Sequence, residues 1–357
     1  MKKIITQILL ILLSSDLYPQ SGWNQQMLPV SGMIYDIEFL NANTGFISMN
    51  TPAVLKTSNG GNSWIVIKNI RIFDIDIIDS TTLYGNGRRD SDGREIFYRT
   101  FNLGVSWDST VYSLDFGFRS INFFNKDTGL ISGAFDIDNL IWRTTNGGNS
   151  IEPLSTITGF GQLFFLKEKV NNEYYGWNLS SGFMSQTTNS GFNWSAPTRV
   201  INGNNGDILS LFFLNKDTGW ISFDQNVGGS EILQTTNGGD NWNNQIGFSS
   251  TYNATDINFV NYLKGWSGRS FLKVYATSNG GQVWGLQNTT LFETSKLEMA
   301  DTLAGWVGFS QLAHTTDGGG LITYIGTDPL NTEIPKSFTL KQNYPNPFNP
   351  QTTIEFS

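Results

Sequence analysis

The sequence contains no cysteine and only one histidine, and it lacks long amphipathic helical stretches. The absence of cysteine excludes disulfides, thiolate catalysis and cysteine-ligated metals. With His314 alone, neither a Ser/His/Asp triad nor a multi-histidine metal site is expected. The net charge of −8 argues against a nucleic-acid partner, because phosphate binding needs a basic surface. We therefore expect no metal and no cofactor.

Aromatic residues and glycines are abundant instead. Aromatics make up 14% of the 357 residues, and there are 38 glycines. This composition is typical of many short strands separated by tight turns. The length suffices for one large β domain or two ordinary ones, either of which would bury a core.

The first residues have the pattern of a secretory signal peptide. Two lysines precede the apolar run Ile4–Leu13, and polar residues follow it. We predict a signal peptide over residues 1–20, cleaved between Ser15 and Ser21. The apolar run is too short to span a membrane comfortably, so the mature protein is expected to have no transmembrane span. A buried N-terminal strand or helix is the alternative.

An eight-residue motif, here called the octet, recurs through the chain, as in "TTNGGDNW" at Thr235–Trp242. Successive copies start 38 to 48 residues apart. The seven copies begin at Thr57, Thr100, Thr144, Thr187, Thr235, Thr277 and Thr315. A period near forty residues in a strand-rich chain is typical of propeller blades.

The chemistry of the octet is that of a hairpin turn. Its first Thr and its third Asn or Asp can bond nearby backbone groups, its fifth residue is always Gly, and five copies end in Trp. A glycine loop that holds a ligand is the alternative, but seven regular copies favour a structural role. The predicted structural residues are Asn59, Gly61, Trp64, Asn102, Gly104, Trp107, Asn146, Gly148, Asn189, Gly191, Trp194, Asn237, Gly239, Trp242, Asn279, Gly281, Trp284, Asp317 and Gly319.

A second motif precedes most octets. It occurs as "FLNANTGFIS" at Phe39–Ser48, "FFNKDTGLIS" at Phe123–Ser132 and "FLNKDTGWIS" at Phe213–Ser222. Each copy has the pattern of a strand, a polar turn, Gly and a short apolar strand. One unit thus comprises four antiparallel strands, which in the first copy are Met33–Leu40, Gly45–Ser48, Ala53–Thr57 and Trp64–Ile67. We predict an all-β fold, a seven-bladed β-propeller of four-stranded blades over residues 21–326.

The two ends of this region contain complementary parts of one repeat. Trp23–Gln26, "WNQQ", resembles Trp242–Gln245, "WNNQ", which starts an outer strand, yet no octet precedes it. The last octet lacks its Trp. We predict that the segment from Trp23 supplies the outer strand of the last blade and closes the ring, which would remove an exposed edge. Alternatively, Leu321–Ile325 completes that blade unaided.

The octet resembles the Asp-box, or BNR repeat, whose pattern is Ser/Thr-x-Asp-x-Gly-x-x-Trp. Six of the seven copies have Asn in place of the Asp, which keeps the acceptor but not the charge. Among Asp-box propellers, the repeat looks most like the photosystem II stability/assembly factor-like group, over roughly residues 22–326. The resemblance implies the fold. It does not choose between the sialidases, xyloglucan-cleaving enzymes, receptors and assembly factors that share it.

The C-terminal segment Ser337–Phe356 resembles the start of the type A sorting domain of the type IX secretion system. The residues that carry this likeness are "YPNPFNP" at Tyr344–Pro350, then Thr353, Ile354 and Phe356. Family members continue for several more strands, so the sequence is either a fragment or has an incomplete signal. We expect a linker over residues 327–336, a truncated sorting domain over 337–357, and the secretion machinery as one partner.

Catalytic residues are sparse in the sequence. The sialidase motif Phe-Arg-Ile-Pro is absent, since "NIRIFD" at Asn69–Asp74 lacks the proline. Glycoside hydrolysis generally needs two carboxylates that flank the sugar bond. The acids that can face the central channel from the starts of inner strands are Asp74, Asp76, Asp115, Asp207 and Asp256. We favour the interpretation that they are turn and channel-mouth residues, with no catalytic role.

Two other polar features have simpler explanations than a site. Arg88–Glu95, "RRDSDGRE", resembles a calcium loop through Asp90 and Asp92 but lacks a third ligand and a distal Glu. A solvated hairpin loop is the preferred interpretation. His314 precedes the last octet and is expected to be a strand residue, with no role as a base.

The loops on the face opposite the octets form the candidate binding face. We predict contacts to a protein or glycan through the aromatic and basic residues Tyr112, Phe116, Phe160, Arg199 and Tyr252. Longer hairpins add an acidic rim of Asp136, Asp138, Asp224 and Glu231. Alternatively, these aromatics only cover the ends of the blades.

These observations favour a secreted or cell-surface propeller that binds a protein or glycan and has no catalytic activity. The location would be periplasmic if the sorting signal is inactive. One alternative is a secreted glycoside hydrolase of the same fold, and another is a periplasmic assembly factor.

Overall fold

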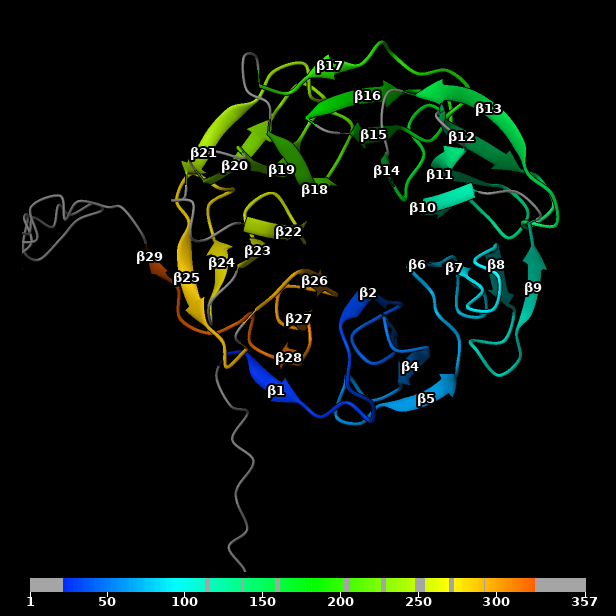
Figure 1. Cartoon of the computed structure of the whole chain (residues 1–357). Coiled ribbons are helices and arrows are strands. Elements are labelled where there is room, and N and C mark those ends of the chain that lie inside the picture. The colour runs from blue at the N-terminus through cyan, green and yellow to red at the C-terminus, as the bar shows by residue number, and fades with distance from the viewer. Residues whose placement is uncertain are drawn as a thin grey trace, which may run out of the picture. The chain divides into compact units, whose positions relative to one another are not determined.

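The computed structural model describes residues 22–324, except for 113–115, 136–137, 158–160, 181, 202–205, 226–228, 248–253, 270–272 and 292. The described residues form strands and turns, with no helix. Seven antiparallel sheets stand side by side around a central axis (Figure 1). The predicted seven-bladed, all-β propeller is confirmed.

Each blade runs from an innermost to an outermost strand. Blade 1 comprises β2 (Ile34–Phe39), β3 (Gly45–Met49), β4 (Ala53–Thr57) and β5 (Ile65–Lys68), and blade 2 comprises β6 (Asp74–Ile77), β7 (Leu83–Arg88), β8 (Glu95–Thr100) and β9 (Asp108–Val111). Blade 3 comprises β10 (Phe116–Phe123), β11 (Gly129–Phe135), β12 (Asp138–Thr144) and β13 (Glu152–Ile157), and blade 4 comprises β14 (Gln162–Phe165), β15 (Gly176–Ser180), β16 (Phe183–Thr187) and β17 (Thr198–Arg199).

The last three blades follow the same order. Blade 5 comprises β18 (Asp207–Phe213), β19 (Gly219–Asp224), β20 (Ser230–Thr235) and β21 (Asn243–Gly247). Blade 6 comprises β22 (Ala254–Phe259), β23 (Gly265–Arg269), β24 (Lys273–Thr277) and β25 (Gly285–Asn288), and β29 (Thr323–Tyr324) adds a fifth strand to it. Blade 7 comprises β26 (Lys296–Met299), β27 (Gly305–Gly308), β28 (Leu312–Thr315) and β1 (Asn24–Gln26).

The N-terminal strand closes the ring, as predicted. β1 pairs antiparallel with β28, and Asn24 lies opposite His314. The Trp23 side chain is buried, and its indole N–H donates to Gln287 Oε1 at 3.1 Å. The Gly22 N–H donates to the Asp317 carboxylate. The alternative, in which Leu321–Ile325 completes blade 7, is wrong, because β29 extends blade 6 instead.

The octets form tight turns held by their own side chains. In the first copy, the Thr57 hydroxyl accepts the Gly61 N–H at 2.9 Å, and Asn59 Oδ1 accepts the Ser63 N–H at 3.0 Å. The fourth and fifth residues of all seven copies have positive φ, which glycine tolerates best. The fourth residue is not glycine in two copies, where Leu103 (φ 49°) and Ser190 (φ 57°) take its place. The hydrogen bonds that hold the turn therefore come from the octet's own residues.

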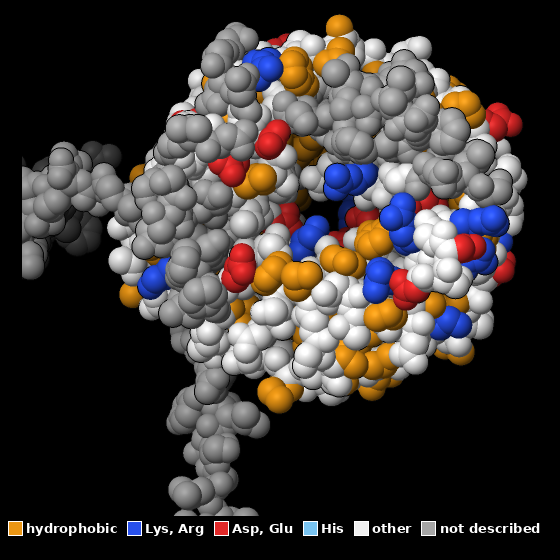
Figure 2. All heavy atoms as spheres, in the orientation of Figure 1, with side chains coloured by type: hydrophobic (Ala, Val, Ile, Leu, Met, Phe, Trp, Pro, Cys, Tyr) orange, Lys and Arg blue, Asp and Glu red, His pale blue; other side chains and the backbone are white. Residues whose placement is uncertain are grey.

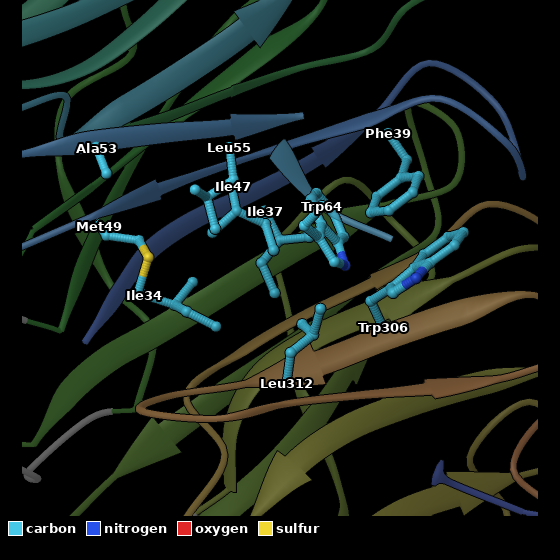
Figure 3. Close-up of a cluster of buried hydrophobic side chains, with 10 residues drawn as sticks. All are labelled: Ile34, Ile37, Phe39, Ile47, Met49, Ala53, Leu55, Trp64, Trp306 and Leu312. Atoms are coloured by element: carbon cyan, nitrogen blue, oxygen red, sulfur yellow. The ribbon is translucent and has the colours of Figure 1, made fainter. Parts of the chain in front are cut away.

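Aromatic side chains join neighbouring blades. Trp220, on the second strand of blade 5, stacks on Phe259 of blade 6 with ring centroids 3.6 Å apart, and its indole N–H donates to Gly280 O in that blade's octet. Figure 3 shows the corresponding contact across the closure, where Phe39 of blade 1 faces Trp306 of blade 7. A Cβ on Gly219 would lie 2.6 Å from the Phe213 ring, which explains the Gly of the second motif.

Candidate functional site: the central channel

The innermost strands place two rings of side chains along the central channel. Successive residues of a strand point to opposite sides. On each innermost strand, the residue three positions before the strand's last residue and the residue one position before it are polar or half-exposed. The first ring comprises Asp36, Asp74, Ser120, Gln162, Ser210, Asp256 and Lys296, and the second comprises Glu38, Asp76, Asn122, Phe164, Phe212, Asn258 and Glu298. Figure 2 shows acidic and basic side chains gathered around the opening at the centre of the ring.

The two sides of the channel differ in chemistry. Six carboxylates come from blades 6, 7, 1 and 2, which are neighbours in the ring. Blades 4 and 5 instead contribute Phe164 and Phe212, whose ring centroids are 5.7 Å apart. Two lysines offset part of the negative charge: Lys296 Nζ lies 4.0 Å from Asp36 Oδ1, and Lys167 Nζ reaches across from blade 4 to within 3.8 Å of Glu38 Oε1.

Most of these carboxylates accept a hydrogen bond from the neighbouring blade. Asp36 Oδ2 accepts the Ile75 N–H at 2.8 Å, and Asp74 Oδ2 accepts the Ile121 N–H at 2.7 Å. Asp76 and Asp256 likewise accept backbone N–H groups of Phe123 and Leu297. An innermost strand has one free edge, whose N–H groups need partners. These four carboxylates supply them, and that role requires no ligand.

Glu38 and Glu298 differ from the other four acids. Within the described part of the chain, neither accepts a hydrogen bond from the next blade. They lie on the neighbouring strands β2 and β26, and both are near Lys167. Burial in the channel raises the pKa of Glu298 to about 8, and it raises the pKa of Glu38 well above its ordinary value. This pair is therefore the part of the channel that could take part in proton transfer.

Desolvation also raises the pKa of Asp74, to about 8, with the nearby Asp36 charge as a second cause. When the pKa of an acid is higher in the folded protein than in the unfolded chain, the free energy of unfolding decreases as the pH rises from the lower pKa to the higher one. We therefore expect the thermal midpoint to fall between pH 5 and pH 8.5. Asp74→Asn keeps an acceptor for the Ile121 N–H but removes the charge, so it should raise stability at pH 8 by about 1 kcal/mol or more.

Calorimetry across this pH range tests the expectation. The advantage of Asp74→Asn should shrink as the pH falls and disappear below about pH 4, because the wild-type carboxyl is then protonated in both the folded and the unfolded protein. Asp240→Asn, at an exposed turn, is the matched control and should leave the pH profile unchanged. A wild-type midpoint that rises steadily from pH 5 to 8.5 would contradict the assignment.

The channel brings together only part of the predicted acidic set. Asp74, Asp76 and Asp256 line the channel as predicted. Asp207 is exposed at the start of β18, outside both rings, and Asp115 lies outside the described residues. Glu38, Glu298 and the two lysines were not predicted from the sequence. The signal that could have found the two glutamates is their place directly before the last residue of an inner strand.

The predicted binding face is only partly described. Tyr112 is half-buried between blades 2 and 3, where its hydroxyl donates to Gly148 O at 2.7 Å. The Arg199 guanidinium lies over the Phe183 ring at 4.5 Å. Phe116 begins β10, but its side chain is outside the described residues, as are Phe160 and Tyr252. The face remains a prediction.

The calcium-like loop is stabilised by ion pairs. Asp90 pairs with Arg71 at 3.0 Å, and Asp92 pairs with Arg89 and Arg94. These arginines occupy the carboxylates that a cation would need, which supports the solvated-hairpin interpretation.

His314 is a strand residue, as expected. It lies in β28, where its ring stacks on Trp306 at 4.8 Å. Burial lowers the pKa of His314 to about 4, so the ring is neutral near pH 7.

Known structures with this fold have different functions. The chain is similar to YCF48 bound to D1 peptide (16% identity, TM-score 0.65), with 84% of this chain and 96% of that one covered. YCF48 from Cyanidioschyzon merolae gives 16% identity and a TM-score of 0.63, over 84% of this chain and all of that one. The GH74 xyloglucanase from Xanthomonas campestris gives 12% identity and a TM-score of 0.67, over 84% of this chain but only 54% of the enzyme.

These likenesses establish the propeller fold alone. No family model and no curated protein sequence matches the chain. Among the described residues, no helix has the length and apolar character needed to cross a membrane.

Proposed function

We propose that this propeller is a binding or scaffold module without catalytic activity. The observation that carries this proposal is the use of the channel carboxylates. Four of the six accept backbone N–H groups of the next blade, so they serve the closed ring and are not free for chemistry. The similar structure of YCF48 with a D1 peptide adds support, because a propeller of this kind there binds a protein segment.

The proposed setting is the outer cell surface or the surrounding medium. It rests on the signal peptide expected over residues 1–20, the Asp-box character of the octets, and the likeness of residues 337–357 to a type IX sorting domain. Both terminal segments lie outside the described residues. Fractionation of cells that express the full chain, with and without residues 337–357, tests this part of the proposal. Equal amounts of both forms in the medium would contradict it.

Glycoside hydrolysis is the second candidate, and one observation favours it. Within the described part of the chain, Glu38 and Glu298 lack the hydrogen bonds to the next blade that the other channel acids accept, and they have raised pKa values, as a general acid requires. Phe164 and Phe212 form the aromatic part of the channel wall, and aromatic rings commonly contact sugars. The similar fold of a GH74 xyloglucanase is consistent with this candidate.

Reducing-end assays on xyloglucan and on sialylated oligosaccharides separate the two candidates. We expect no turnover above the buffer rate by the full chain, because the geometry favours a binding module. The Glu298→Gln variant would then behave like wild type, as would Asp207→Asn, whose exposed acid lies outside the rings. Turnover that Glu298→Gln abolishes and Asp207→Asn retains would establish the hydrolase instead.

A further inference from the structure

The outermost strand of blade 1 is apolar and uncovered, unlike the other outer strands described. On β5, Ile65 is 61% exposed and Val66 is 37% exposed. Each of the other outer strands has a feature that hinders pairing with a further strand. β1, β9 and β21 are mainly polar, and β13 contains Pro153. β17 has only two residues, and β25 is covered by β29. β5 lies at the outer rim of the ring (Figure 1). Its free backbone edge can therefore accept a further strand.

The octet of blade 2, which lies beside β5, is also unusual. It reads "TFNLGVSW" and has apolar residues at three positions that are mainly small or polar in the other copies. Phe101 is 52% exposed and Val105 is 82% exposed. Leu103 takes a left-handed conformation that five other octets give to glycine. A leucine there costs backbone energy, and such strain persists chiefly at functional positions.

The two features border one hollow. Ile65 and Ile67 of blade 1 and Leu103 and Val105 of blade 2 line a cavity of about 270 Å³ between the blades. The volume is sufficient for a branched apolar side chain. Exposed apolar surface of this kind, beside a free strand edge, is typical of a site for strand addition.

The charges around the hollow indicate the occupant. Among the described residues, the only charged ones that line it and its neighbouring surface are Lys56 and Lys68, in a protein whose net charge is −8. A second copy pairing through β5 would bring four lysines together without a carboxylate among the lining residues. A segment with acidic residues would gain from both lysines. β29 on β25 shows that the rim of this propeller accepts an added strand.

We propose that β5 and the blade 2 octet form a docking site for an extended segment of another protein, with alternating apolar residues and acidic residues at its ends. The segment pairs with β5 as a fifth strand of blade 1 and inserts one branched side chain between Ile65 and Val105. This inference rests on the proposed binding function and names the place and the chemistry of the bound segment.

A labelled peptide and the full chain test the site. The probe is the fluorescein-labelled peptide Glu-Thr-Val-Thr-Val-Thr-Val-Glu, followed by fluorescence anisotropy. We expect saturable binding that Ile65→Lys weakens at least tenfold. Leu103→Gly should weaken binding about fivefold while the fold stays intact, because glycine suits this conformation and occupies it in five other octets. Val105→Thr should weaken binding as well.

Controls distinguish docking at this site from non-specific binding of the peptide. Phe192→Thr is the matched control for Val105→Thr, since Phe192 holds the same octet position in blade 4 and is 50% exposed; binding should not change. A peptide with proline at the central valine should fail to bind, because it cannot form the strand pairing. The proposal is overturned if wild type does not bind the probe, if the variants bind like wild type, or if light scattering shows a dimer that Ile65→Lys dissociates. The reducing-end assays on xyloglucan and sialylated oligosaccharides test the proposed function independently of these outcomes.

Discussion

A chain that begins at Ser31 is expected to unfold at a clearly lower urea concentration than one that begins at Ser21. The shorter chain loses β1, the buried Trp23 side chain and the hydrogen bonds to Gln287 and Asp317. Loss of a buried tryptophan alone costs about 3–5 kcal/mol, and an unpaired β28 edge adds to that cost. Urea melts followed by tryptophan fluorescence measure the difference.

Two variants of the longer chain show where the loss arises. Trp23→Ala should reproduce most of the destabilisation, because its ring packs between blades 6 and 7. Met27→Ala is the control; its side chain is 84% exposed, so the urea midpoint should change little. Equal midpoints for the chains starting at Ser21 and Ser31 would show that closure by β1 does not stabilise the ring.

The second large effect is expected from Trp220→Ala. The Trp220 ring is fully buried, stacks on Phe259 of the next blade and donates its N–H to that blade's octet turn. Its removal leaves a cavity between two blades and takes one donor from the Gly280 carbonyl, which still accepts from Gln234 Nε2 at 3.3 Å. We expect a loss of about 3–5 kcal/mol in the free energy of unfolding, measured by urea denaturation.

Trp220→Phe separates packing from the hydrogen bond. Phenylalanine keeps much of the stacking on Phe259 but has no N–H, so its cost should be closer to about 1–2 kcal/mol. Trp242→Ala, in the partly buried octet position of the same blade, should cost less than Trp220→Ala. A Trp220→Ala variant as stable as wild type would contradict the role assigned to these aromatics in joining the blades.

Most of the fold could be predicted from the sequence repeats. Octets at near-regular spacing predicted the blades, because each octet supplies its own turn chemistry from local residues such as Thr57 and Asn59. The closing strand was predictable for a related reason: "WNQQ" is recognisable as an outer strand without its turn. The place of β29 was not predictable, since any uncovered blade edge offers the same backbone groups to a strand.

The candidate site was much less predictable. Glu38 and Glu298 lie far apart in the sequence, and only closure of the ring places them on neighbouring strands. Their pKa values depend on burial and on Lys167, which reaches them from blade 4 across the channel. The hollow beside β5 likewise combines side chains of two blades.

The number of blades, the turns and the strand that closes the ring follow from the amino-acid sequence, because local hydrogen bonds and strand alternation act within one repeat. Three properties follow from the folded ring: which side of each inner strand faces the channel, which carboxylates bond to the next blade, and which outer edge is left uncovered. Those properties depend on distances between repeats, and the folded ring sets these distances.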